Sequence, residues 1–184
     1  MGIAIQQSKP YKVYTALLTQ SGGDTEDSIS AGTLTVGVTY RINQDSTGMD
    51  FTNVGAPNNN IGTAFVATGI TPNSWGAGAT YTLAYNAGAP VVTVLENTIG
   101  NIWFTYEGVG YYSIHSNGLF IQPYLIFISN NTQDSDDVLQ LVKTKIYDIS
   151  TSDIKTYGAG QIQNTSISSD NILFNTPIEI RVYN

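Results

Sequence analysis

The sequence predicts an all-β protein, an antiparallel β-sandwich of jelly-roll-like type with a small inserted β-rich module. Three observations support this. Short runs rich in Val, Ile, Thr and Tyr recur along the chain, turn residues separate nearly all of them, and almost no stretch has helical spacing. The 184 residues include 18 Gly and 12 Tyr, a composition of strands and turns. Short strands at regular intervals favour a sandwich or a barrel.

Two long predicted strands open the chain. The first covers Tyr11–Thr19 and stops at Ser21-Gly22-Gly23-Asp24, a run of turn residues. The second covers 33–42, where every second residue from Leu34 to Ile42 is apolar. Such alternation predicts a strand with one face on a core and the other in water.

The remainder of the chain repeats this pattern. Further strands are predicted at 62–68, 80–85, 91–96, 102–107, 110–115, 124–129, 138–147, 154–157, 171–174 and 178–183. Turn dipeptides such as Asn117-Gly118 fall between them. Only 50–55 and 134–141 are suited to a short helix. The second is equally a loop that runs into a strand, because the residues from Leu139 onward alternate.

Composition restricts the function classes. The formal net charge is −7 with only seven Lys and Arg residues, which disfavours nucleic acids and anionic membrane surfaces as partners. The absence of Cys excludes disulfides and thiolate metal sites. Residues 1–7 lack the pattern of a secretory signal, and no run approaches the roughly 20 apolar residues of a membrane span. We expect no cofactor, no nucleic-acid partner and no membrane partner.

Few side chains are suited to catalysis. The single His, His115, precedes a predicted turn, but no Gly-x-Ser-x-Gly elbow accompanies it, and a zinc site needs further His or Cys ligands. Glu96 and Glu107 flank Trp103 and are candidates for the two catalytic carboxylates of a glycosidase, which must lie about 5–10 Å apart. Carboxylates on neighbouring strands are also ordinary solvent-facing residues. We therefore expect a protein that is not an enzyme.

Two further features are candidates for ligand contact. The loop 130–137 offers Asn and Asp oxygens to calcium but lacks the Gly and Glu positions of an EF-hand loop, so a solvated loop is the preferred interpretation. Trp75 lies in the Gly-rich run 71–78 and is expected to be the exposed aromatic, with a glycan or partner contact as its role. Trp103 lies in the middle of a strand and is expected in the core.

Several phrases resemble accessory or fibre-like structural proteins of tailed-phage virions, with parallels in phages of Bacteroidota-type hosts. These phrases are 11–22, 90–100 together with Trp103, and 177–183. In such proteins the first phrase runs almost directly into the second, whereas here about 65 residues intervene. The intervening residues resemble a separate phage module, through Leu34-x-Val36-Gly37-x-x-Tyr40-x-Ile42, the run 50–56 and the run 65–69.

The resemblance implies a virion structural protein, made in the host cytoplasm and located in the phage particle. Such a protein decorates the head or the tail and acts through homo-oligomerisation and docking on other virion proteins. A trimer suits a fibre-like protein. The resemblance supplies no functional residues. The alternative function is a module that binds a polysaccharide of the host surface, with Trp75 as the candidate contact residue.

The two phrases predict two units. Residues 1–23 plus 88–184 form a discontinuous β-sandwich domain, and 24–87 form an inserted small β-rich module. We expect Tyr11–Thr19 to pair with strands of 88–184, because the chain ends of an inserted unit lie close together. A unit near the size of 24–87 is only marginally stable alone, so we expect contacts with the rest of the protein or with a partner to stabilise it.

Overall fold

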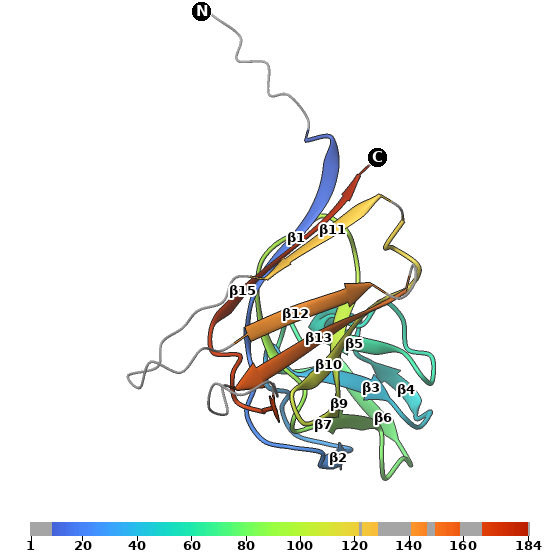
Figure 1. The fold of residues 1–184 in the computed structure, drawn as a ribbon. Coiled ribbons are helices and arrows are strands. Elements are labelled where there is room, and N and C mark those ends of the chain that lie inside the picture. Colours follow the sequence, from blue (N-terminus) through green and yellow to red (C-terminus); the bar gives the residue numbers. More distant parts are fainter. Residues whose placement is uncertain (1–8, 122, 129–140, 147–149, 159–166, 184) are drawn as a thin grey trace, which may run out of the picture.

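The structure is a computed structural model, and it describes residues 9–121, 123–128, 141–146, 150–158 and 167–183 (Figure 1). The described part holds no α-helix. Its elements are β1 (Tyr11–Thr19), β2 (Glu26–Ile29), β3 (Thr39–Ile42), β4 (Thr47–Asp50), the 3₁₀ turn η1 (Thr52–Val54), β5 (Ala64–Val66), β6 (Ser74–Ala77), β7 (Leu83–Asn86), β8 (Val91–Asn97), β9 (Ile102–Gly108), β10 (Tyr111–Ser116), β11 (Tyr124–Ile128), β12 (Leu141–Ile146), β13 (Thr151–Gly158), β14 (Ile167–Ser168) and β15 (Thr176–Tyr183). The fold is all-β, as the sequence predicts.

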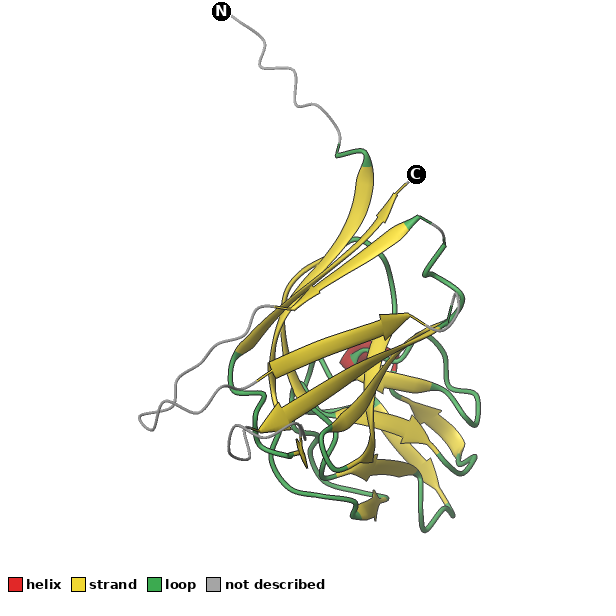
Figure 2. Cartoon of the chain, viewed as in Figure 1, coloured by secondary structure: helices red, strands yellow, loops and turns green. Residues whose placement is uncertain are grey.

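Two antiparallel sheets form the sandwich (Figure 2). The first sheet has the strand order β11-β15-β1-β8, and the second has the order β12-β13-β10-β9, with β14 paired to β13. Alternate residues of β1 point into the space between the sheets: Tyr14, Ala16 and Leu18 are almost fully buried. They meet Phe104 and Ile114 from the second sheet in the first core. Period-two alternation on both sheets therefore places one face of each sheet on the shared core and turns the other face outward.

Residues 24–87 add two small sheets, a four-stranded one with the order β2-β7-β3-β5 and the pair β4-β6. The aromatic rings of Tyr40, Phe51 and Phe65 lie at the centre of a second core, which also contains Ile42 and Leu83. These strands are only three or four residues long. The packing of the aromatic rings therefore stabilises 24–87 more than the hydrogen bonds between its short strands do.

The strand β1 pairs with β15 on one side and with β8 on the other. The expectation that Tyr11–Thr19 pairs within 88–184 is therefore met. The strands of 24–87 hydrogen-bond only to one another in the described ladders. Whether 1–23 plus 88–184 and 24–87 behave as two units stays a prediction.

The chain leaves the sandwich and returns to it at neighbouring points. Ala87 N donates to Thr25 O at 2.8 Å, and Asn86 Nδ2 donates to Asp24 Oδ1 at 3.1 Å. A Cβ on Gly88 would lie 2.6 Å from Gly23 O. The backbone at Gly88 is therefore too close to Gly23 to admit a larger residue at position 88, and 24–87 starts and ends at one place.

Hydrogen bonds and apolar contacts dock 24–87 on the sandwich. Val92 N donates to Gly37 O at 2.8 Å, and Phe104 N donates to Thr39 Oγ1 at 3.3 Å. Val66 is buried in the first core, although it belongs to β5. The inserted region therefore shares hydrogen bonds and apolar surface with both sheets of the sandwich.

Several local expectations were wrong. In 33–42 only Thr39–Ile42 is a strand, because Gly37 has φ of +87° and turns the chain, leaving Val36 exposed. Asn171–Phe174 is not a strand either, since Asn171 has a positive φ of 62°. The stretch 50–55, a candidate for a short helix, is right in part, since it contains the 3₁₀ turn η1. Of the candidate helix or loop at 134–141, Leu141 begins β12, and 134–140 lie outside the described residues.

Candidate functional site

His115 lies on β10 and belongs to a small polar group on the outer face of the second sheet. Its ring stacks on Trp103 with centroids 5.5 Å apart and planes at 14°. Its Nε2 lies 2.7 Å from Thr105 Oγ1, whose hydroxyl donates to Glu107. Glu107 Oε1 lies 4.0 Å from this same Nε2, whereas a triad places its orienting carboxylate on the other ring nitrogen, Nδ1. The group holds β9 and β10 side chains in place and is not arranged as a triad.

The two glutamates of the possible glycosidase pair have different partners. Glu96, on β8, pairs with Lys9 at 3.0 Å, whereas Glu107, on β9, lies in the second sheet beside His115. No described contact joins them. Within the described residues no group of three or more His, Asp or Glu side chains is placed to hold a metal. The candidate calcium loop 130–137 lies outside the described residues.

Trp75 was expected to lie exposed in a Gly-rich loop, but the structure places it in β6. It is half-buried and packs on the second core, with its ring edge-on to Phe51 at a centroid distance of 5.4 Å. Its Nε1 donates to Gly32 O at 3.0 Å. The indole is thus engaged in packing and in an internal hydrogen bond. Its role as a glycan or partner contact stays a prediction.

The outer face of the first sheet carries large apolar side chains. We define this outer face by Tyr11, Leu95, Leu125, Phe127, Pro177 and Tyr183. Leu95 is 63% exposed, Phe127 48% and Leu125 44%. Leu95, Phe127 and Pro177 line a shallow, mostly apolar groove of about 380 Å³ across the four strands of this sheet. Contiguous exposed apolar surface of this kind marks interaction sites.

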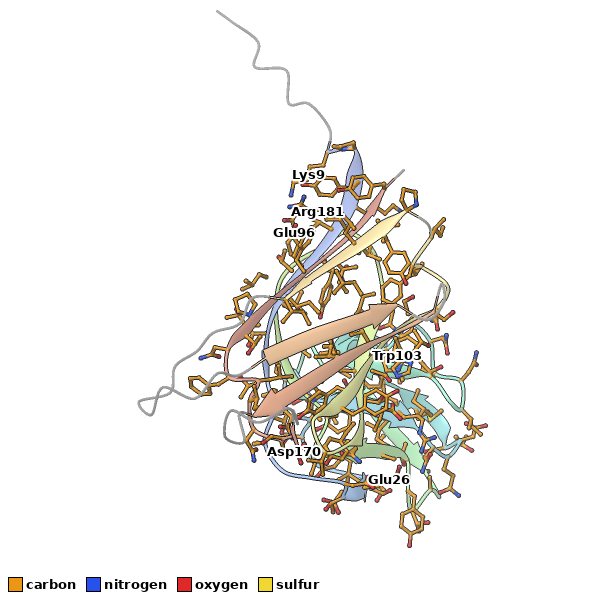
Figure 3. All side chains as sticks on the ribbon, viewed as in Figure 1. Lys9, Glu26, Glu96, Trp103, Asp170 and Arg181 are labelled. Atoms are coloured by element: carbon orange, nitrogen blue, oxygen red, sulfur yellow. The ribbon has the colours of Figure 1, made fainter. Side chains whose placement is uncertain are left out.

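The charges on this outer face are paired within the chain. Arg181 forms an ion pair with Glu179, and its guanidinium lies 4.9 Å from the ring centre of Tyr11 and 5.3 Å from that of Phe127. The hydrogen bond to Glu179 raises the pKa of Arg181. Figure 3 shows Lys9, Glu96 and Arg181 gathered at the same end of the sheet. Two basic and two acidic groups thus balance one another, on a chain with a net charge of −7.

A second hollow lies where β9 meets the four-stranded sheet of 24–87; we call it the β9 cleft. Its volume is about 350 Å³, and it opens to solvent on one side. Three alanines, Ala64, Ala84 and Ala89, form small lining positions, and the other lining residues are aromatic, charged or neutral polar. Trp103 belongs to this lining and is half-buried, so the expectation that it is a core residue was only partly right.

Two of the tyrosines that line the β9 cleft are held by carboxylates. Tyr106 Oη donates to Asp170 Oδ2 at 3.0 Å, and Tyr85 Oη donates to Asp27 Oδ2 at 3.5 Å. Burial raises the pKa of both phenols, with a further contribution from these carboxylates. Both phenols are therefore neutral hydrogen-bonding groups at physiological pH.

The sequence did not indicate this cleft. Its lining comes from β2, β3, β5, β7 and β9, so residues far apart in the chain meet only in the folded protein. The signal available was Trp103 with Thr105 on one parity of a strand, which shows a face but not its neighbour. The outer face was partly foreseeable, since period-two alternation in the predicted strands separates an outward-facing set of residues from the core-facing set.

No known family model, curated protein or solved structure matches this chain significantly. A search of the described residues for a helix long and apolar enough to cross a membrane also found none. The two surfaces are therefore interpreted from their own chemistry.

Proposed function

We propose that this protein is a structural component of a tailed-phage virion that decorates the head or the tail. The virion assignment is supported by the resemblance of the phrases at 11–22, 90–100 and 177–183. The observation that carries the mode of action is the apolar, charge-balanced outer face of the first sheet. On this proposal copies of the chain associate through this face and dock on other virion proteins.

The charge distribution favours a second copy as the partner of the outer face. The whole chain is acidic, so two copies repel each other over most of their surfaces. On the outer face Lys9 and Arg181 offset Glu96 and Glu179. Exposed Phe127 and Leu95 would lose water on contact, which contributes roughly 25 cal/mol for each Å² of apolar surface buried. Closed symmetric oligomers are the usual result of such self-contact.

Self-association is tested with a charge placed in the groove. Phe127→Glu should shift the self-association equilibrium toward the monomer by about tenfold or more, since a buried unpaired carboxylate opposes contact. Tyr81→Glu is the matched control, because Tyr81 is 62% exposed on 24–87, away from the face. Analytical ultracentrifugation over a range of concentrations measures both. A wild-type chain that stays monomeric throughout, or equal effects of the two variants, would count against assembly through this face.

The virion role has a separate test. Peptides of this chain should be found by mass spectrometry in purified particles, and a map of the intact particle should show density for it on the head or the tail. Its absence from purified particles would refute the virion role while leaving the self-association result untouched. The same map would give the number of copies at each position.

A further inference from the structure

We infer that the β9 cleft is a binding site for a neutral saccharide. The proposal does not depend on the outer face or on the virion role. It rests on three properties of the described residues: the size of the hollow, the fixed aromatic groups at its wall and the mixed charges at its rim. Figure 3 labels Trp103 and Glu26, two residues of its lining.

The hollow has the size and floor that a ring-shaped ligand requires. Its volume of about 350 Å³ lies at the lower end of the roughly 300–1,000 Å³ of ligand pockets. Ala64, Ala84 and Ala89 leave space that larger side chains would fill. One side is open, which permits the ends of a longer chain to leave the site. These features suit one or two sugar rings of an oligosaccharide.

The aromatic wall is fixed before any ligand arrives. The ring of His115 stacks on the indole of Trp103 at 5.5 Å, and Asp170 holds the hydroxyl of Tyr106 at 3.0 Å. Rigid Trp and Tyr side chains offer contact area at a low entropic cost. The C–H faces of a sugar pack on such rings. The phenol oxygens of Tyr85 and Tyr106, whose protons are donated to Asp27 and Asp170, can still accept hydrogen bonds from sugar hydroxyls.

The charges of the rim select a neutral ligand with many hydroxyls. Arg41 pairs with Glu26 at 3.4 Å, both are about half exposed, and Asp24 lies nearby in the same lining. An anionic ligand would meet the two carboxylates, and a cationic one would meet the guanidinium. A neutral polyol can accept from Arg41 and donate to the carboxylates, and hydrogen bonds to charged groups are the stronger ones. Nucleic acids are disfavoured by the net charge of −7.

The emission of Trp103 provides the readout. In Trp75→Phe, Trp103 is the only remaining Trp, so a change in its fluorescence reports the cleft. The probes are oligosaccharides of glucose, galactose and mannose, together with an oligogalacturonate as the anionic counterpart. We expect at least one neutral oligosaccharide to shift the emission of Trp103 in a saturable way, and to bind more tightly than the oligogalacturonate.

Calorimetry on chains that retain Trp75 tests the residues. Trp103→Ala should weaken binding about tenfold or more, and Arg41→Gln about fivefold, since both remove ligand contacts. Arg41→Gln is a surface change, so it keeps the test valid if Trp103→Ala fails to fold. Tyr81→Ala is the control and should bind as the wild type does. The proposal is overturned if no neutral probe binds, if the oligogalacturonate binds as tightly, or if binding survives both cleft variants. A polypeptide that binds the cleft while every saccharide fails would equally overturn it.

Discussion

The strands β1 and β15 are nine and eight residues long and pair along almost their whole length, whereas β3 and β5 in 24–87 have only four and three residues. The two regions nevertheless reach similar burial at their centres, since Phe104 in the first core and Phe65 in the second are both fully buried. The sandwich thus relies on long ladders, and 24–87 must obtain its order elsewhere.

Side-chain hydrogen bonds contribute to that order, together with the aromatic packing of the second core. Asp50 Oδ1 accepts from the backbone N–H and the hydroxyl of Thr52, at 3.0 and 2.6 Å, and Asp50 Oδ2 accepts from Asn73 Nδ2 at 2.9 Å. Asn59 Oδ1 accepts from Phe51 N, and Asn53 Oδ1 accepts from Asn73 N, both at 2.9 Å. Asn and Asp are suited to this role because their short side chains reach nearby backbone groups. In 24–87, hydrogen bonds from loop side chains therefore compensate for the short hydrogen-bond ladders between its strands.

The largest expected effect separates the two cores. Phe104→Ala should lower the free energy of unfolding by about 3–5 kcal/mol, because it leaves a cavity where β9 meets both regions. Phe65→Ala should speed amide hydrogen exchange in 24–87 well before it affects β1 and β15. Denaturant unfolding measures the first and exchange mass spectrometry the second. Equal acceleration in both regions after Phe65→Ala would mean that they unfold as one unit and would remove the contrast.

The next effect tests the contact that docks 24–87 on β8. A Cβ on Gly37 would lie 2.4 Å from Val92 O, and φ is +87°. Gly37→Ala should therefore cost more than the about 1–3 kcal/mol of backbone strain alone. Gly32→Ala is the matched control, because φ is +94° but nothing lies within 4 Å of its Cβ. Equal losses of unfolding free energy in the two variants would show that the contact with β8 contributes nothing.

The smallest expected effect depends on pH. The hydrogen bonds from Thr52 and then Asn73 hold the pKa of Asp50 well below its ordinary value. Since its pKa is lower in the folded state, the carboxylate stabilises the fold above about pH 4 and progressively less as the pH falls below that value. Asp50→Asn should destabilise the protein at neutral pH and flatten its loss of stability in acid, as followed by denaturant titration. Asp45→Asn, on the same segment, is the control and should leave the acid profile steep.

The sequence predicted the strands of the sandwich well, because strands with one face on the first core alternate clearly between inward and outward residues. Tyr11–Thr19 and Ile102–Gly108 are examples. The strands β4 and β6 were missed, since Thr-Gly-Met-Asp and Ser-Trp-Gly-Ala contain glycine and lack alternation. They are strands because they pair with each other, which local propensity does not contain.

The candidate sites show the same limit. Trp75 drew attention because its sequence neighbours are glycines, yet Phe51 and Gly32 O, distant in sequence, take up its ring and its N–H. Trp103 was assigned to a core because it lies mid-strand, yet β9 is the edge of its sheet and faces a hollow. Which side of a strand lacks a neighbour is a tertiary property. It cannot be read from period-two alternation alone.

The close approach of Gly23 and Gly88 has a consequence for variation. Since the polypeptide departs and returns at one point, we expect that a segment of different length or sequence could replace 24–87 without moving the flanking strands. The replacement would have to cover the edge of β9 as Thr39 and Val66 do here.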